Sequence, residues 1–114
     1  MHDAVADGMD VGQARDASDP RLGRALEGLR VADGYHTEVN LAAEDWVGEA
    51  AEVFERGLVT VIDYGLVEEA YYAPGRGDGT LRGYRNHRLV EDLYTGIGET
   101  DLTAHVNFTR LARA

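Results

Sequence analysis

The feature that most constrains this chain is a short unbroken run of apolar and β-branched residues, LVTVI, at positions 58–62. A strand that is apolar on both faces must be covered on both faces, as happens inside a parallel sheet with helices packed on each side. The run ends in a polar turn made by Asp63, Tyr64 and Gly65. The sequence therefore predicts α/β architecture, in which residues 58–64 form a central strand.

The segment before this run has the pattern of an amphipathic helix. Its apolar residues recur at helical spacing and share one face, namely Ala43, Trp46, Val47, Ala50, Ala51 and Phe54. Asn40 is placed to cap the start of this helix, and Gly57 is placed to end it. A helix that leads directly into a two-sided strand supports the α/β interpretation.

The 114 residues are enough for one domain with a small core. Residues 1–19 are small, polar and acidic, and such a segment cannot offset its ordering entropy, so they are expected to form a disordered acidic tail. The domain then covers residues 20–114. It opens with a short helix over residues 20–30, for which Asp19 is the expected cap.

The second half of the chain alternates turns with short strand-like pieces. TLRGY at residues 80–84 and DLTAHV at residues 101–106 have strand character, and a glycine turn lies between them at residues 96–98. Asn107 is a candidate cap for a helix that begins at Phe108.

Composition excludes several classes of function. A net charge of -10 repels nucleic acids and anionic membranes, so neither is expected as a partner. The chain has no cysteine, which excludes a disulfide framework and a Cys-based zinc site. The first residues lack the pattern of a signal peptide, and no apolar run is long enough to cross a bilayer. A cytoplasmic protein is expected.

The loop YYAPGRGDGTLRGYRNHR contains a G-x-G-x-G over residues 75–79. A glycine loop that cradles phosphate needs an apolar strand before it and a helix after it. Here AYYAP precedes and TLRGY follows, so we interpret the glycines as a turn. An Arg-Gly-Asp at residues 76–78 and a glycosylation sequon at Asn107 would both require secretion, and coincidence explains them better.

The charged side chains leave two questions open. Four arginines could hold an anionic ligand, although pairing with the surplus acids of the chain is the favoured use: Arg76, Arg82, Arg85 and Arg88. Asp63 ends the apolar run, where α/β proteins place ligands, yet an Asp there also commonly caps a turn. The histidines have no metal-ligand spacing, so no metal site is predicted.

Four blocks, TEVNLAAEDW, GLVTVIDYG, GDGTLRGYRNHR and GETDLTAHVNFTRL, occur in an order and with gaps that resemble a known family. This is the MidA-like family of class I S-adenosylmethionine-dependent methyltransferases, whose mitochondrial members are protein arginine methyltransferases needed for assembly of respiratory complex I. The resemblance extends from about residue 35 to residue 111. Asn107 stands where the family more often has Asp, and both residues can cap a helix.

The resemblance implies a partial Rossmann-like methyltransferase sheet that lacks the N-terminal cofactor-binding strands. Residues 58–64 would be its central strand and residues 65–101 its substrate-side loops. Members of the family are several times longer than this chain, and their glycine-rich cofactor loop lies upstream of everything seen here. S-adenosylmethionine is the cofactor of the full-length family, and it is not expected to bind this chain alone.

The resemblance also assigns residues to roles. Those expected on the substrate side are Tyr64, Gly65, Thr80, Arg82, Tyr84, Asp101 and His105. Asp63 and His87 are the catalytic candidates, since either could orient or deprotonate the methyl acceptor, and nothing in the sequence decides between them.

Three hypotheses about function follow. The first is a segment of a methyltransferase that acts on protein and is inactive alone. The second is a noncatalytic binding or assembly module. The third is a degenerate, truncated gene product that folds poorly, because a sheet without its neighbours exposes strand edges and apolar faces.

Overall fold

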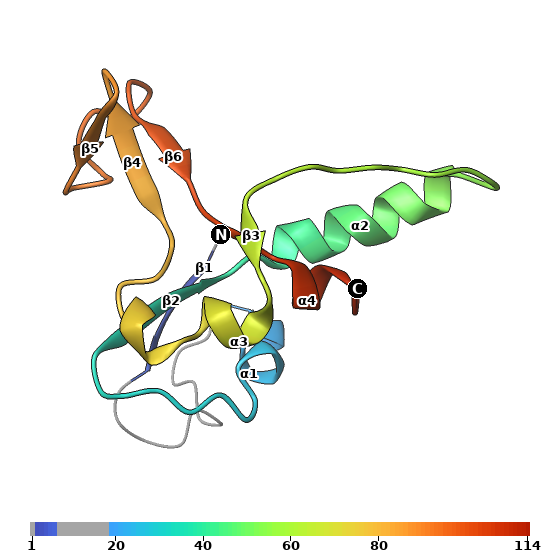
Figure 1. The fold of residues 1–114 in the computed structure, drawn as a ribbon, viewed down its shortest axis with the longest axis horizontal. Coiled ribbons are helices and arrows are strands. Elements are labelled where there is room, and N and C mark those ends of the chain that lie inside the picture. The colour runs from blue at the N-terminus through green and yellow to red at the C-terminus, as the bar shows by residue number, and fades with distance from the viewer. Residues whose placement is uncertain (1, 7–18) are drawn as a thin grey trace.

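A computed structural model of the chain describes residues 2–6 and 19–114, which form short helices and strands in a mixed arrangement (Figure 1). The elements follow in the order β1 (His2–Ala6), α1 (Pro20–Ala25), β2 (Tyr35–Val39), α2 (Leu41–Val53), β3 (Gly65–Leu66), α3 (Glu68–Tyr71), the 3-10 turn η1 (Pro74–Arg76), β4 (Arg82–Arg85), β5 (Arg88–Val90), β6 (Asp101–Thr103), β7 (Val106–Asn107) and α4 (Phe108–Leu111). Among the described residues these strands make three small sheets, where the sequence predicts one parallel sheet.

The first sheet corrects the expectation of a disordered tail over residues 1–19. Residues 2–6 form β1, which pairs antiparallel with β2 so that His2 lies opposite Val39. Pairing of this kind uses backbone groups, so a free strand edge can accept a segment whose composition suggests disorder. Asp19 is also ordered and caps α1, while the rest of the expected tail, residues 1 and 7–18, lies outside the described residues.

Helix α1 begins where the sequence predicts and ends earlier. The Asp19 carboxylate accepts a hydrogen bond from the backbone N–H of Arg21 at 2.8 Å. The helix ends at Ala25 and not at residue 30, and Gly28 adopts a positive φ of 79° that continues the chain into a turn. The buried side chains that join α1 to β2 and α2 form the main apolar core, which contains Leu22, Leu26, Val39 and Leu41.

Helix α2 confirms the predicted cap, since Asn40 Oδ1 accepts from the backbone N–H of Ala43 at 3.1 Å. The helix ends at Val53, before Gly57. Of its predicted apolar face, Trp46 and Phe54 remain 51% and 53% exposed. Burial of α2 is therefore concentrated at its first residue, Leu41, which is only 3% exposed.

The predicted central strand over residues 58–64 is not a strand in this structure. Residues 57–64 form neither helix nor strand, all of them are exposed, and the segment returns alongside α2 toward β3 (Figure 1). A strand exists only when a neighbour pairs with its backbone, and none of the described residues pairs with residues 58–62.

Strand β3 follows this segment and pairs in parallel with β7, with Gly65 opposite Val106. A Cβ atom at Gly65 would lie 2.4 Å from both the ring of Phe108 and the carbonyl oxygen of Val106, so this close approach requires glycine. Asn107 caps α4 as predicted, because its Oδ1 accepts from the backbone N–H of Arg110 at 3.1 Å.

The third sheet is antiparallel, and β4 lies between β5 and β6. The strand-like character of residues 80–84 and 101–106 predicts β4 and β6, whereas β5 has no counterpart among the predicted elements. A two-residue turn joins β4 to β5, and both of its residues, Asn86 and His87, have positive φ, at 50° and 61°. Such turns favour Asn followed by Gly. Because His87 stands in the second position, the sequence does not have the usual pattern from which a hairpin is predicted.

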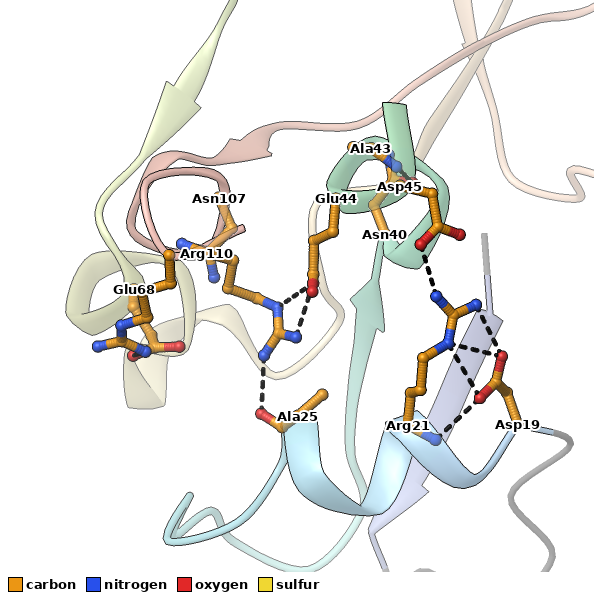
Figure 2. A network of polar contacts seen from close by, with 11 residues as sticks. Asp19, Arg21, Ala25, Asn40, Ala43, Glu44, Asp45, Glu68, Asn107 and Arg110 are labelled. Carbon is orange, nitrogen blue, oxygen red and sulfur yellow. Dashed lines mark hydrogen bonds and ion pairs between the residues drawn. The ribbon is translucent and has the colours of Figure 1, made fainter. Parts of the chain in front are cut away.

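One arginine joins three helices (Figure 2). Nε and Nη2 of Arg110 in α4 both contact Glu44 Oε1 of α2 at 2.6 Å. Nη1 of the same residue donates to the carbonyl oxygen of Ala25 in α1 at 3.0 Å. Both charged side chains are largely buried, at 15% and 24% exposure, so this contact is screened less than a surface pair.

Replacing Arg110 by alanine should therefore destabilise the chain. We expect the free energy of unfolding to fall by about 1–3 kcal/mol, because Glu44 loses a charge-assisted partner and the Ala25 carbonyl loses its donor. The control is Arg113→Ala, which removes a more exposed pair with Glu68 and should change the free energy by no more than about 1 kcal/mol. Urea unfolding followed by circular dichroism measures both, and equal losses would contradict this account.

Because three tyrosines are buried, the chain should lose stability at alkaline pH. Burial raises the pKa of Tyr35, Tyr71 and Tyr72, for Tyr72 to about 12. Because the unfolded chain releases these protons near pH 10, the stabilisation is complete below about pH 10 and is lost as the pH rises toward 12. Melting temperatures measured between these values should fall steeply, and less steeply for Tyr72→Phe. The exposed control Tyr94→Phe should leave the fall of melting temperature with pH unchanged. If Tyr72→Phe also leaves it unchanged, the Tyr72 hydroxyl is not responsible for the loss of stability.

Candidate functional site

A buried carboxylate from β2 lies where three of the sequence blocks that carry the family resemblance meet. Glu38 is 3% exposed, and its Oε1 accepts hydrogen bonds from the backbone N–H of Thr80 at 2.6 Å and from the backbone N–H of Leu81. The Thr80 hydroxyl lies 3.2 Å from the same oxygen. Glu38 thus holds the start of the TLRGY segment as the side chain of an N-cap holds a helix.

Thr80 extends this contact to two further parts of the chain. Its hydroxyl, in a side chain that is 4% exposed, accepts from the backbone N–H of His105 at 3.0 Å. The same hydroxyl lies 3.4 Å from the hydroxyl of Tyr71 in α3. The blocks TEVN, GTLR and TAHV, which are far apart in the sequence, therefore meet at one point.

The glycine loop is packed against β2 and does not form an anion cradle. His36 donates its backbone N–H to the Gly77 carbonyl at 2.7 Å, and Tyr35 donates its hydroxyl to the Ala73 carbonyl at 3.1 Å. Gly79 has a positive φ of 64°, and a Cβ there would lie 2.3 Å from Glu38 Oε2. The amides of Thr80 and Leu81, which directly follow the loop, already bind Glu38 and are therefore not free to bind a phosphate.

Two buried polar atoms beside this centre have no protein partner among the described residues. They are Oε2 of Glu38 and Nδ1 of His105. Buried polar atoms of this kind normally bind a protein group or an ordered water. The carboxylate can therefore accept one more hydrogen bond, and the imidazole nitrogen can take part in another.

A second group of predicted residues meets at the tip of the antiparallel sheet. Tyr84, His87 and Asp101 line one open hollow, together with Asn86 and Glu99. Tyr84 and Asp101 are brought together because they are register partners on β4 and β6. The hollow offers an imidazole and two carboxylates to solvent, a combination suited to binding a cationic side chain and accepting a proton.

The remaining predicted residues lie elsewhere. Arg82 donates Nη1 to the Leu81 carbonyl at 2.7 Å and so binds its own loop. Asp63 lies in the exposed segment before β3, where its Oδ1 accepts from the backbone N–H of the next residue, Tyr64, at 2.7 Å, and it caps neither a helix nor a turn. Tyr64 is 81% exposed, and Gly65 lies in the ladder between β3 and β7. The catalytic candidates Asp63 and His87 therefore belong to different substructures.

Sequence reasoning assigned no role to Glu38 or Tyr71. The sequence offers only a weak signal for Glu38, because it lies between Thr37 and Val39, two β-branched residues typical of strands, and a charged residue in a buried strand needs a partner. Its partner lies 42 residues away, and no local pattern identifies it. Within the described part of the chain, no group of three or more His, Asp or Glu side chains is arranged to bind a metal.

No helix within residues 2–6 and 19–114 is both long enough and apolar enough to cross a bilayer.

Two known structures resemble this one. A COG1565 superfamily member from Burkholderia thailandensis, solved bound to S-adenosyl-homocysteine, is 32% identical with a TM-score of 0.76, over 87% of this chain and 26% of that chain. The native structure of an uncharacterized COG1565 superfamily protein from the same organism is 32% identical with a TM-score of 0.79, over 89% of this chain and 27% of that chain. This chain thus spans about a quarter of the length of either protein.

The sequence as a whole matches one family of proteins. No curated protein matches it significantly. The family model described as "Putative S-adenosyl-L-methionine-dependent methyltransferase" matches residues 5–114, which includes every element from α1 to α4. The chain therefore belongs to this family of S-adenosyl-L-methionine-dependent methyltransferases.

Proposed function

We propose that this chain is the substrate-side segment of a MidA-like methyltransferase that modifies protein, and that it does not transfer a methyl group alone. The observation that carries this proposal is the convergence of three family blocks on Glu38, in a chain whose family match covers residues 5–114. S-adenosylmethionine supplies the methyl group on its sulfonium, and the residues of this chain would position the acceptor.

The hollow at the tip of the antiparallel sheet is the proposed acceptor site. Its carboxylates, Glu99 and Asp101, suit a cationic side chain, which supports a protein acceptor such as arginine. His87 is the proposed proton acceptor because it lines this hollow. Asp63 is the weaker candidate, since its carboxylate binds the next backbone amide. Glu38 and Thr80 would act as positioning residues, holding the start of β4 in place.

A noncatalytic binding module is the second candidate, and the exposed apolar residues favour it. Leu58 and Ile62 are 90% and 93% exposed, and such surfaces commonly bind another protein. The two proposals agree that this chain alone does not bind the cofactor. They differ in whether the segment supports methyl transfer once the rest of the enzyme is present.

Removing the Glu38 carboxylate should destabilise the chain where β2 contacts the start of β4. We expect Glu38→Ala to lower the free energy of unfolding by about 2–4 kcal/mol, because the amides of Thr80 and Leu81 lose their acceptor. The control is Glu49→Ala on the exposed side of α2, which should change the free energy by less than about 0.5 kcal/mol. Chemical unfolding of both variants measures these changes. Similar changes in the free energy of unfolding for the two variants would show that Glu38 does not hold the start of β4 in place.

Calorimetric titration tests the cofactor proposal. S-adenosylmethionine should give no saturable heat with this chain, whereas a chimera should bind it. In the chimera, residues 19–114 replace the matching segment of the Burkholderia protein that was solved with S-adenosyl-homocysteine. We expect the chimera to bind within about tenfold of the parent affinity. Micromolar binding by this chain alone, or no binding by a folded chimera, would contradict the proposal.

Incorporation of tritiated methyl groups tests the acceptor class. The chimera should label protein in a cell extract, and His87→Ala should abolish labelling without changing the affinity for S-adenosyl-homocysteine. Asp63→Ala is the matched variant and should retain labelling. Label found only in small molecules or nucleic acid would exclude a protein acceptor.

A further inference from the structure

The arginines of residues 76–88 are not used as the sequence predicts. Pairing with the surplus acids of the chain is the favoured use, yet Arg82 donates instead to the carbonyl oxygens of Leu81 and Gly79. The other three arginines form no ion pair with any described residue, namely Arg76, Arg85 and Arg88. The chain has 21 acidic and 11 basic residues, so a shortage of acids does not explain these free cations.

Two of the unpaired arginines are neighbours across the hairpin of β4 and β5. Arg85 and Arg88 are register partners on either side of the Asn86–His87 turn. The side chains of register partners point to the same face of a sheet, and their Cβ atoms lie about 5 Å apart. Like charges directly opposite each other are unfavourable, and an anion held between them relieves the repulsion. The hairpin therefore places two guanidinium groups within reach of one anion.

The guanidinium of Arg85 is held on the loop that joins β5 to β6. A Cβ atom on Gly96 would overlap Nη1 of Arg85, so the guanidinium packs directly on this glycine. Gly96 has a positive φ of 71°, and its carbonyl oxygen accepts from the Thr100 hydroxyl at 3.2 Å. Arg85 is half-buried, while Arg88 is exposed. One guanidinium is thus fixed before any ligand arrives, which lowers the entropy lost on binding.

The acid at the start of this loop is committed to its own turn. Asp92 accepts hydrogen bonds from the backbone N–H of Tyr94 at 2.9 Å and from the Thr95 hydroxyl at 2.6 Å. The Thr95 bond, followed by the Tyr94 bond, lowers the pKa of Asp92. Its carboxylate is therefore satisfied without either arginine.

The acidic hollow of the same sheet is on the other face. Tyr84 and Asp101, which line the hollow, are register partners on β4 and β6. Tyr84 directly precedes Arg85, and successive side chains of a strand point to opposite faces. The sheet of β4, β5 and β6 projects away from the helices, so a ligand can approach either face (Figure 1).

We propose that Arg85 and Arg88 form a binding site for an oxyanion, supplied either as free phosphate or as a carboxylate of a partner protein. Each guanidinium presents parallel N–H groups that match the oxygens of such an anion, and the two groups together can share one ligand. The site is separate from the proposed acceptor hollow, and its binding requires neither the cofactor nor methyl transfer.

Nuclear magnetic resonance titration of the full chain with inorganic phosphate tests the site. Low ionic strength limits screening, and at about pH 7.5 the histidines are mostly neutral. The carbon signals of Arg85 and Arg88 Cζ should shift together and saturate with a dissociation constant of about 1–10 mM, because exposed charge pairs contribute little. Equal shifts at every exposed arginine would overturn the proposal.

A matched pair of variants separates the site from the overall charge. Arg88→Gln removes one exposed guanidinium and should weaken phosphate binding at least about fivefold, without changing the melting temperature. Arg56→Gln removes the same charge at another exposed arginine that forms no ion pair with a described residue, and should weaken binding less than about twofold. Equal weakening by the two variants would contradict the proposal.

Arg85→Lys tests the contribution of guanidinium geometry. Lysine keeps the charge and loses the planar pair of donors, so we expect phosphate binding to weaken at least about threefold. Circular dichroism confirms that the variant is folded. Unchanged affinity in this variant would show that the site is not built from two guanidinium groups.

A second probe identifies the source of the anion. A peptide of alternating glutamate and glycine is titrated into the same samples. Tighter binding of the peptide than of phosphate, lost in Arg88→Gln, identifies the carboxylate of a partner protein, whereas binding of phosphate alone identifies the free ion. Saturable binding of neither probe would overturn the proposal. None of these measurements involves S-adenosylmethionine, so the proposed function is tested separately.

Discussion

The arrangement of this chain depends on one buried carboxylate. Glu38 binds the backbone amides of Thr80 and Leu81 from a position where it is only 3% exposed. A charged group in such a place is stable only when hydrogen bonds replace the water it has lost. The Thr80 hydroxyl in turn accepts a hydrogen bond from the backbone N–H of His105. Through Glu38 and Thr80, β2 is therefore connected to the segment that leads into β7. Without this contact, the blocks TEVN, GTLR and TAHV would lose the point at which they meet.

The rest of the described chain divides into a part whose apolar side chains are buried and a part whose apolar side chains are exposed. Around the core of α1, β2 and the start of α2, apolar side chains are buried and Arg110 connects three helices (Figure 2). At residues 57–64 and at the outer end of α2, apolar side chains and backbone groups face solvent. The chain thus combines a local apolar core with a separate apolar surface that none of the described residues covers.

Local signals in the sequence predicted local structure well. Asp19, Asn40 and Asn107 each cap a helix as expected, because a cap involves residues only two or three positions apart. The expected strand at residues 58–64 depended on neighbours that the described chain does not provide, and β1 formed because β2 offered a free edge. Glu38 escaped notice for the same reason, since its role appears only when loops distant in sequence close onto β2. Of the predicted site residues, Thr80 and His105 meet at Glu38, while Tyr84, His87 and Asp101 meet at the tip of the sheet.

The contact between Glu38 and the backbone amides of Thr80 and Leu81 is the central feature of the structure. Amide exchange measured by nuclear magnetic resonance on the unmodified chain tests it directly. The amide protons of Thr80 and Leu81 should exchange at least about a hundredfold more slowly than that of Thr60, whose N–H bonds no described residue. Exchange of all three at the rate of an unfolded chain would contradict the account, because Glu38 would then not hold the blocks together.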